Sequence, residues 1–450
     1  MDPMAIIPQF GGIFMTAVAF IVALSIIVAI HEYGHYIVGR WCGIKAEVFS
    51  LGFGPVLFSR TDRHGTRWQF AALPFGGYVK FMGDANAASG TASDGYEAMN
   101  AEQKRHTMLG APLWARTLTV AAGPVFNFIL SIIVFTAVMM AQGKVAEPLA
   151  VGELTDLPVE GITLQPGDEL VRIEGQEVPA RDAESGEGFQ DFIDALPQRD
   201  LLEYEVRRDG DLVTVQGPYP MPPHVVQLSP QSAAYDIDMK QGDVITAVDD
   251  QPIVSFAQLQ ELVETSEGRV LQLDVWRDGE TLEFALAPRR VDEPQDEGGF
   301  RTQWRIGIVG GLAFEPATER LGPIDALANG TAQVGQVISG SVSGLYHMIT
   351  RQISSCNMSG PIGIAEVSGA MASQGISNYI WFIAVLSTAV GLLNLFPIPV
   401  LDGGHLVFYA YEAVAGRPPS DKALRIIMTV GLVFVLSVMA FAITNDLFCP

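Results

Sequence analysis

Four long apolar segments constrain what this chain can fold into more than any other feature of its sequence. They are Phe10–Ile30, which has no charged residue, and Leu118–Ala141, Tyr379–Val400 and Ile426–Ile443. A helix of about 20 predominantly apolar residues crosses the hydrocarbon core of a bilayer. Hydrophobic residues make up 49% of the chain and charged residues only 17%, which is low for a soluble globular protein. The sequence therefore predicts a polytopic α-helical membrane protein with four transmembrane helices.

The first apolar segment could instead be a secretory signal peptide. The residues before it include no Lys or Arg, however, and no small-residue cleavage site follows it. We therefore expect a transmembrane helix that continues to about Arg40.

The basic residues between the apolar segments predict the orientation in the membrane, because cytoplasmic loops are enriched in Lys and Arg. Such residues lie between the first and second spans and between the third and fourth, whereas the two termini have none. We expect a multi-pass membrane protein with both termini facing away from the cytoplasm, which in a Gram-negative bacterium is the periplasmic side of the inner membrane. The C-terminal end of the first span then faces the cytoplasm.

Between the second and third spans lies a long acidic region. The net charge is −23, and most of the acidic residues fall between Glu147 and Glu319. By the charge rule this region lies on the same side of the membrane as the two termini, away from the cytoplasm. Its acidic surface argues against nucleic acid as a partner and leaves the lipid bilayer and proteins.

An internal repeat divides the acidic region. Leu164–Val178 matches Met239–Ile253, and each copy is followed by a helix-like stretch and a strand pattern that ends in Asp-Gly. Asp-Gly pairs suit two-residue hairpin turns. The repeat predicts two tandem β-rich modules inserted into the membrane protein.

Two further segments have a readable pattern. Val48–Met82 alternates apolar and polar residues around a His64-Gly65 turn, which predicts β-hairpins close to the membrane. Pro323–Ile353 has one apolar stripe at helical spacing. That helix could lie on the membrane or against the helical bundle, or it could be a packing helix that closes the soluble part.

The cysteines follow no pairing pattern. Cys42, Cys356 and Cys449 include no Cys-x-x-Cys motif, so we expect neither a disulfide framework nor a cysteine-rich metal site.

The end of the first apolar segment carries a His-Glu-x-x-His motif, His31–His35. Residues i and i+4 of a helix share a face, so both imidazoles can bind one Zn²⁺ ion. Zinc lowers the pKa of bound water to about 7, and Glu32 could take that proton as a general base. Such polar residues are costly in an apolar span, which favours a functional site over a polar cluster that only packs helices together.

A catalytic zinc ion usually has three protein ligands and one open position. Asp402 is the best candidate for the third ligand, since it follows the third span and should lie at the depth of the two histidines. It also precedes two glycines that allow close approach of the backbone. His405 is the rival ligand, and Asp402 could instead only cap the following helix.

Together these motifs resemble those of the site-2 protease family over nearly the whole chain. The resemblance rests on His31–His35 and on the Asn-x-x-Pro-x-Pro-x-Leu-Asp-Gly pattern of Asn394–Gly403. Gly76–Lys80, Gly123–Phe128 and Ser359–Ile364 are similar to further family segments, and the tandem repeat resembles PDZ domains.

The resemblance implies an intramembrane zinc metalloprotease with one Zn²⁺ per chain, bound by His31, His35 and Asp402, and with Glu32 as the general base. It implies that membrane β-strands pair with an unwound substrate segment. The substrate-binding residues implied are Asn394, Asn127, Gly76, Gly77, Tyr78, Pro397 and Pro399. Implied substrates are membrane-spanning proteins of the anti-sigma factor type, already trimmed by another protease, and remnant signal peptides.

The domain organisation follows from these segments. The predicted boundaries are 1–144 for an N-terminal membrane part, 145–222 and 223–290 for two PDZ-like domains, 291–375 for a linker with an amphipathic helical region, and 376–450 for a C-terminal membrane part.

The two modules depart from the usual PDZ pattern in the segments expected to capture a peptide carboxylate, Val151–Leu154 and Ala233–Ile237. This departure favours a size filter against substrates with bulky periplasmic domains. Two other functions remain as alternatives, a catalytically silent PDZ scaffold and a zinc transporter. The general base beside the two histidines argues against both.

Overall fold

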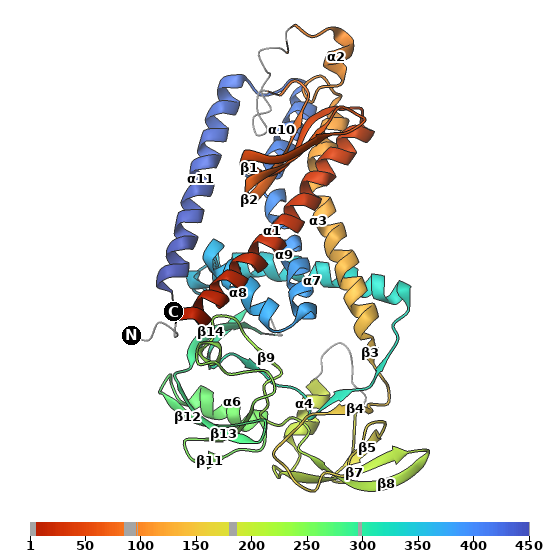
Figure 1. Ribbon diagram of the computed structural model, residues 1–450, viewed down its shortest axis with the longest axis vertical. Helices are drawn as coiled ribbons and strands as arrows, with labels where there is room; N and C mark the ends of the chain where they lie inside the picture. The colour runs from red at the N-terminus through yellow and green to blue at the C-terminus, as the bar shows by residue number, and fades with distance from the viewer. Residues whose placement is uncertain (1–5, 85–95, 97, 180–186, 296–298, 450) are drawn as a thin grey trace. The chain divides into compact units, whose positions relative to one another are not determined.

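The computed structural model describes residues 6–84, 96, 98–179, 187–295 and 299–449 (Figure 1). Its helices are α1 (Ile6–Trp41), α2 (Ala101–Arg105), α3 (Leu113–Gln142), α4 (Glu187–Asp194), α5 (Ala233–Asp236), α6 (Phe256–Thr265), α7 (Pro323–Ile349), α8 (Pro361–Ser373), α9 (Ile376–Leu395), α10 (Asp402–Ala415) and α11 (Asp421–Phe448). The longer strands are β1 (Ala46–Thr61), β2 (Arg67–Phe81), β5 (Glu169–Ile173), β7 (Leu201–Arg208), β8 (Asp211–Pro218), β10 (Val244–Val248), β12 (Leu271–Arg277), β13 (Glu280–Leu286), β14 (Arg289–Pro294) and β15 (Phe300–Arg305). The short strands are β3 (Lys144–Val145), β4 (Val151–Leu154), β6 (Gln176–Glu177), β9 (Gln227–Leu228), β11 (Gln251–Pro252), β16 (Ile308–Val309), β17 (Phe314–Pro316) and β18 (Thr318–Glu319).

The chain divides into two compact units. One, called here the membrane unit, comprises residues 1–138, 324–346 and 355–449. The other, called the inserted unit, comprises residues 139–323 and 347–354. Each unit is described by itself.

Four helices are long and apolar enough to cross a bilayer, which confirms the predicted number of spans. They are α1, α3, α9 and α11. The predicted end of the third span at Val400 was wrong, because α9 ends at Leu395. Pro397 lacks a backbone donor and disfavours helical backbone in the residue before it, so the chain turns here before α10 begins.

Helices α1, α3 and α9 pack through small and hydroxyl-bearing side chains. The Tyr379 hydroxyl donates to the Ala19 carbonyl oxygen at 2.5 Å, which joins α9 to α1. The Ser131 hydroxyl of α3 donates to the Ala384 carbonyl of α9 at 2.8 Å, and Ser387 donates back to the Asn127 carbonyl at 3.0 Å. Small residues let helix backbones approach closely in a membrane, where polar groups must find partners inside the protein.

Strands β1 and β2 confirm the predicted hairpins and their turn at His64-Gly65. Both strands bend, so that Phe49 pairs with Val79 on one side and with Trp68 on the other. The bend in β1 includes Gly52, whose φ of +91° is accessible to glycine. Residues 77–81 therefore form an outer edge of this sheet. The C-terminal part of α1 lies against β2 (Figure 1).

The inserted unit contains the repeat as two four-stranded sheets of matching order, β6-β5-β7-β8 and β11-β10-β12-β13. Each sheet has one helix, α4 or α6, in the same place in the sequence. Each copy also has the same ion pair between a buried aspartate and a partly exposed arginine. Arg208 donates to both oxygens of Asp168, and Arg277 donates to both oxygens of Asp243, all at 2.6 Å.

The buried aspartate of the first copy has a perturbed pKa. Burial would raise the pKa of Asp168, but hydrogen bonds from Arg208 and from the Gln165 amide outweigh burial and lower it. The side chain of Asp168 is 1% exposed and that of Arg208 is 28% exposed.

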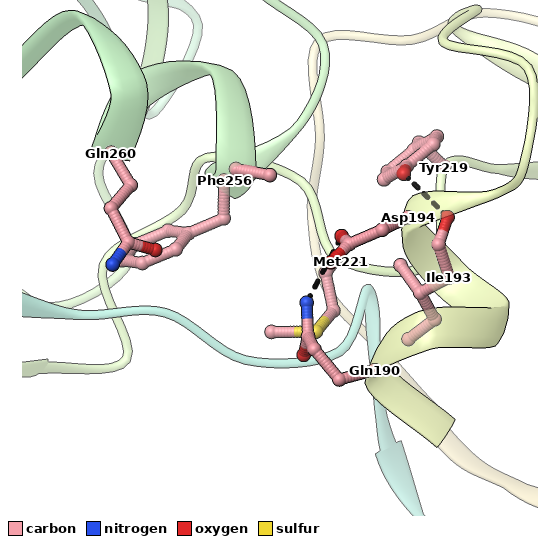
Figure 2. Close-up of a pocket in the computed structure, with 8 residues that line it drawn as sticks. Gln190, Ile193, Asp194, Tyr219, Met221, Phe256 and Gln260 are labelled. Atoms are coloured by element: carbon pink, nitrogen blue, oxygen red, sulfur yellow. Dashed lines mark hydrogen bonds between the residues drawn. The ribbon is translucent and has the colours of Figure 1, made fainter. Parts of the chain in front are cut away.

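A cavity of about 290 Å³ lies between the two copies (Figure 2). Gln190 and Ile193 of α4 line one side of it, and Phe256 and Gln260 of α6 line the other. Its eight lining residues include Asp194 but no Lys or Arg.

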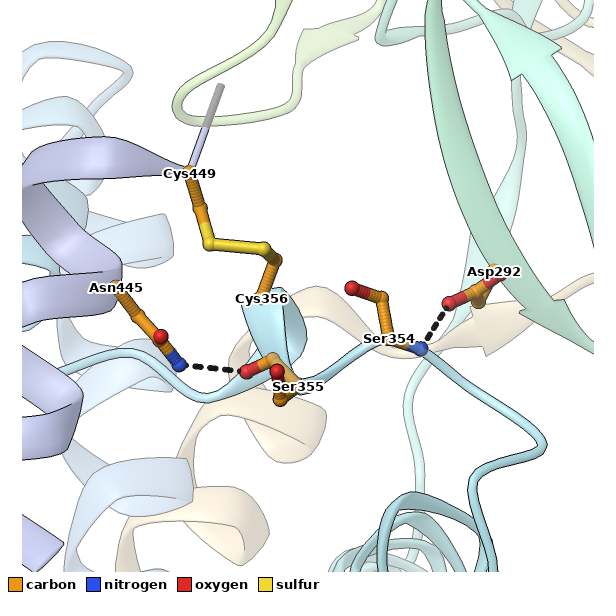
Figure 3. The surroundings of a disulfide bond; sticks show 6 residues. All are labelled: Asp292, Ser354, Ser355, Cys356, Asn445 and Cys449. Atoms are coloured by element: carbon orange, nitrogen blue, oxygen red, sulfur yellow. Dashed lines mark hydrogen bonds between the residues drawn. A yellow bond between two sulfur atoms is a disulfide. The ribbon is translucent and has the colours of Figure 1, made fainter.

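The C-terminus corrects the prediction on cysteines. Cys356 and Cys449 form a disulfide across 93 residues of sequence (Figure 3). The prediction failed because spacing carries no information on a pair brought together by tertiary structure. Neighbouring contacts join the same segments. The Asn445 amide donates to the Ser355 carbonyl, and the Asp446 carboxylate accepts from the Gly360 and Ile362 amides at the start of α8.

Candidate metal centre

The His-Glu-x-x-His motif lies within the continuous helix α1. His31 and His35 are one turn apart on the same face, as the sequence predicted. Their Nε2 atoms are 3.2 Å apart and their ring centroids are 4.8 Å apart. The two imidazoles therefore converge on one point.

Asp402, the first residue of α10, brings a carboxylate to the same point. Its Oδ2 atom lies 3.1 Å from His31 Nε2 and 3.4 Å from His35 Nε2. The two following glycines allow this approach. A Cβ atom on Gly403 would lie 2.2 Å from the Phe396 carbonyl oxygen, and one on Gly404 would lie 2.3 Å from the Ile398 carbonyl oxygen.

This donor set fits zinc. Ligand bonds of 2.0–2.1 Å in tetrahedral geometry place two ligand atoms roughly 3.3 Å apart, and the three separations are 3.1, 3.2 and 3.4 Å. Asp402 Oδ2 is buried without a hydrogen-bond partner within the described part of the chain. A buried acceptor of this kind is costly unless a cation or donor satisfies it. The rival His405 does not belong to the cluster of three.

Helix α3 packs against both histidines. His35 Nδ1 donates to the Thr119 carbonyl oxygen at 2.9 Å, which leaves the Nε2 lone pair for a metal. Gly123 makes room for both rings, since a Cβ atom there would lie 2.4 Å from His35 Nε2 and 2.8 Å from His31 Cε1. The sequence signal for this close approach was Gly123, the first residue of the Gly123–Phe128 segment that is similar to a family segment.

Asn127, predicted to contact substrate, is fully buried in the structure. Its side-chain amide lies 3.3 Å from His31 Nδ1, and its Oδ1 atom has no partner among the described residues. Rotation of the Asn127 side-chain amide exchanges the positions of its Nδ2 and Oδ1 atoms. With Oδ1 turned toward Nδ1–H, Asn127 would hold His31 in the same tautomer as His35. Its contact with substrate stays a prediction.

Glu32 lies between the two histidines in sequence and faces strand β2. A Cβ atom on Gly77 would lie 3.2 Å from Glu32 Cγ. Gly76 and Tyr78 flank this position. The Tyr78 hydroxyl accepts from Gln69 at 3.1 Å, and its ring stacks on that of Phe53. The outer edge at residues 77–81 is thus next to the candidate base.

The remaining predicted substrate residues lie at and after the end of α9. Asn394 donates to the Val390 carbonyl of its own helix at 3.0 Å and is partly exposed. Pro397 is exposed, and Pro399 lies close to Gly431 of α11. Their roles stay predictions.

The hairpin turn is fixed to α1 next to the motif, by a residue that sequence reasoning missed. Asp62 accepts hydrogen bonds from the Tyr36 hydroxyl, the Trp68 indole and the His64 and Thr66 amides. Burial would raise the pKa of Asp62, but these hydrogen bonds lower it to about 2. The Asp-Arg-His-Gly turn was the only available signal.

Comparison with known proteins agrees with this geometry. The model of peptidase family M50 matches residues 19–438. The chain belongs to peptidase family M50, the site-2 protease family.

The chain is also similar to individual proteins. It is 34% identical over 435 residues to a protein of Agrobacterium fabrum named as a zinc metalloprotease, covering 96% of this chain and 95% of the relative. It is 33% identical to a protein of Rhizobium meliloti named in the same way, covering 96% of each chain. A third relative, the regulator of sigma-E protease RseP of Salmonella typhimurium, is 33% identical over 454 residues, covering 95% of this chain and 97% of the relative.

Membership of the M50 family and the four apolar helices make the chain a membrane zinc metalloprotease with a Zn²⁺ cofactor. The family assignment also removes the silent scaffold and the zinc transporter as leading alternatives.

Proposed function

We propose that this M50 protease hydrolyses peptide bonds in or near the transmembrane segments of single-span membrane proteins. The observation that carries the proposal is the convergence of His31 Nε2, His35 Nε2 and Asp402 Oδ2 in the same unit as the apolar helices. In this proposal the three residues bind zinc, and Glu32 is the general base.

Zinc and the residues of the protein have separate roles in the proposed reaction. When bound, zinc acts as a Lewis acid that lowers the pKa of water and polarises a carbonyl oxygen. The chain orients its ligands through Thr119 and Asn127. Glu32 accepts a proton from the attacking water and delivers it to the leaving amine, as a general base and then a general acid.

Binding of an extended substrate is the second part of the proposal. A transmembrane helix has its peptide bonds hydrogen-bonded and hidden, so cleavage needs an unwound segment. The outer edge at residues 77–81, near Gly76, Gly77 and Tyr78, could pair with that segment by strand addition. Asn394, Asn127, Pro397 and Pro399 would then position the segment at the metal.

The substrate class and the cellular location belong to the proposal as well. The relative from Salmonella is named for regulation of sigma-E, which suggests anti-sigma factor type substrates trimmed by another protease, in regulated intramembrane proteolysis. Remnant signal peptides have the same single-span form. We place the protein in a bacterial inner membrane with both termini and the inserted unit in the periplasm. The Cys356–Cys449 disulfide supports this orientation, since disulfides persist in oxidising compartments.

The two repeated modules, proposed as PDZ-like domains, would act as a size filter. The cavity between α4 and α6 contains a carboxylate and no basic side chain among its lining residues. A substrate carboxylate would meet no countercharge there. This composition favours exclusion of bulky periplasmic domains over capture of a C-terminus.

The test compares the purified wild type with Glu32→Gln on a trimmed single-span substrate, in detergent with zinc. We expect cleavage by the wild type and none by Glu32→Gln, with one zinc per chain in both. Equal cleavage by both proteins would identify a contaminating protease and remove Glu32 as the base. Absence of cleavage by the wild type on several single-span substrates would contradict the proposed substrate class.

A further inference from the structure

A largely buried ion pair joins two helices of the membrane unit. Arg116 of α3 donates through both terminal nitrogens to the two carboxylate oxygens of Glu412 on α10, at 2.5 and 3.1 Å. The two side chains are 13% and 18% exposed. The Arg116 guanidinium also lies over the Tyr409 ring, 5.2 Å from its centroid.

This pair belongs to a closed series of contacts that includes the candidate ligands and is called here the circuit. Arg116 is one helical turn before Thr119, whose carbonyl oxygen accepts from His35 Nδ1 at 2.9 Å. His35 Nε2 in turn lies 3.4 Å from Asp402 Oδ2. From Asp402, helix α10 continues over roughly 15 Å to Glu412, which returns to Arg116.

The circuit has a geometric consequence for Asp402. The glycines after Asp402 fix the start of α10 against the end of α9, but one point of contact leaves the direction of a helix free. Farther along α10, Leu406 and Tyr409 pack against a cluster that includes Ala115 and Val120 of α3. The Arg116–Glu412 pair adds a contact whose geometry is fixed. A metal site requires its ligands to be held within about 0.5 Å and in the correct orientation. Because Asp402 is the first residue of α10, the direction of this helix helps to set how its side chain points toward the histidines.

The chemistry of the pair also suits it to hold α3 and α10 in a fixed orientation. A bidentate guanidinium–carboxylate contact fixes orientation as well as distance. Burial of such a pair is weak evidence for stability alone, because the loss of hydration offsets much of the attraction. Arg116 Nε is buried without a hydrogen-bond partner in the described part of the chain, so the two bonds to Glu412 do not use all the donors of the guanidinium.

We propose that Arg116 and Glu412 are positioning residues that hold Asp402 at the distance from His31 and His35 that zinc requires. The inference rests on the proposed ligand set. It assigns a role in the metal centre to two residues that contact none of the three ligands.

The test measures zinc affinity in the full-length protein in detergent, for Arg116→Gln, Glu412→Gln and the double variant. Zinc content is determined over a series of buffered free zinc concentrations, and the visible spectrum of the Co²⁺-substituted protein reports ligand geometry. We expect each single variant to bind zinc about tenfold more weakly, at the lower end of the range for residues that contact metal ligands directly, and to show an altered cobalt spectrum. The double variant, whose two amides can bond to each other, should recover part of the loss.

A control variant separates positioning from packing. Asp446→Asn weakens the contacts between α11 and α8, which lie off the circuit. It should lower the midpoint of thermal unfolding and leave zinc affinity and the cobalt spectrum unchanged.

The outcomes distinguish this inference from the proposed site. Wild-type zinc affinity and cobalt spectrum in both single variants would overturn the inference alone, as would strictly additive losses in the double variant. Retention of one zinc per chain by Asp402→Ala would overturn the ligand set, and the inference with it.

Discussion

Cys356 and Cys449 form a disulfide that ties the end of α11 to the segment before α8 (Figure 3). Since disulfides persist in oxidising compartments, we predict that both residues face the periplasm. In intact spheroplasts, a membrane-impermeant maleimide should label Cys356 and Cys449 only after impermeant reductant is added. In Cys356→Ser, Cys449 should be labelled without reductant.

Cys42 should mark the cytoplasmic side of the membrane, opposite to the side marked by Cys356 and Cys449. It is a free cysteine next to the end of α1, and we expect label there only after the membrane is opened. Label on Cys42 in intact spheroplasts, with none on reduced Cys449, would reverse the proposed orientation.

The ligand set predicts which histidine matters for metal content. Asp402→Ala and His35→Ala should each reduce bound zinc from one per chain to near zero at nanomolar free zinc, measured by atomic emission after gel filtration. His405→Ala should retain zinc, because His405 lies outside the cluster of three. Loss of zinc in His405→Ala together with retention of zinc in Asp402→Ala would make His405 the third ligand.

Much of the centre could be predicted from sequence because its information is local. The i, i+4 spacing of His31 and His35 needs only a helix, and the glycines after Asp402 indicated close backbone approach. Arg116 and Glu412 are 296 residues apart, and neither belongs to a local pattern. Their pairing depends on how α10 packs against α3, which no spacing rule contains.

The fold likewise has features that contiguous sequence predicts and features that depend on tertiary contacts. Apolar length predicted the four spans and the repeat predicted two similar sheets, since both are properties of contiguous sequence. The fold-back of β1, which pairs Phe49 on two sides, depends on register between bent strands. The Cys356–Cys449 disulfide likewise depends on tertiary contact.

The space beside the histidines predicts a steric effect at Gly123. A Cβ atom at this position would lie 2.4 Å from His35 Nε2, so Gly123→Ala must displace the ring or α3. We expect zinc affinity to fall by at least about tenfold, by the same ligand-orientation argument. Gly12→Ala in α1, where a Cβ atom meets nothing within 4 Å, is the matched control and should bind zinc as the wild type does. Equal affinities of the two variants would show that the backbone relaxes at Gly123.

The repeated ion pair predicts the stability of the first module. Asp168→Asn should destabilise it by about 2–3 kcal/mol, below the ~3–5 kcal/mol of a fully buried pair because Arg208 remains partly exposed. Hydrogen exchange of the β5 and β7 amides in the full-length protein would measure the loss. Arg172→Gln breaks the exposed pair with Glu205 and should cost at most about 0.5 kcal/mol.

The same pair predicts a pH dependence. The folded-state pKa of Asp168 lies below its ordinary value of 3.8. The stabilisation is therefore complete above pH 3.8 and is lost as the pH falls through the folded pKa. Exchange in the wild type should accelerate over this acidic range, whereas Asp168→Asn should lack this component. The same acceleration in both proteins would assign it to other groups.

The size-filter hypothesis predicts a gain of substrates when the repeated modules are removed. Deletion of residues 151–288 takes out both four-stranded sheets but leaves α1, α3, α9 and α10, which carry the candidate centre and its supports. We expect the shortened protein to cleave an untrimmed single-span substrate that the wild type leaves intact, and to cleave the trimmed form at a similar rate. Glu32→Gln in the shortened protein should abolish both. Unchanged selectivity would contradict the filter, and loss of cleavage of the trimmed form with normal zinc content would instead assign the modules to substrate binding.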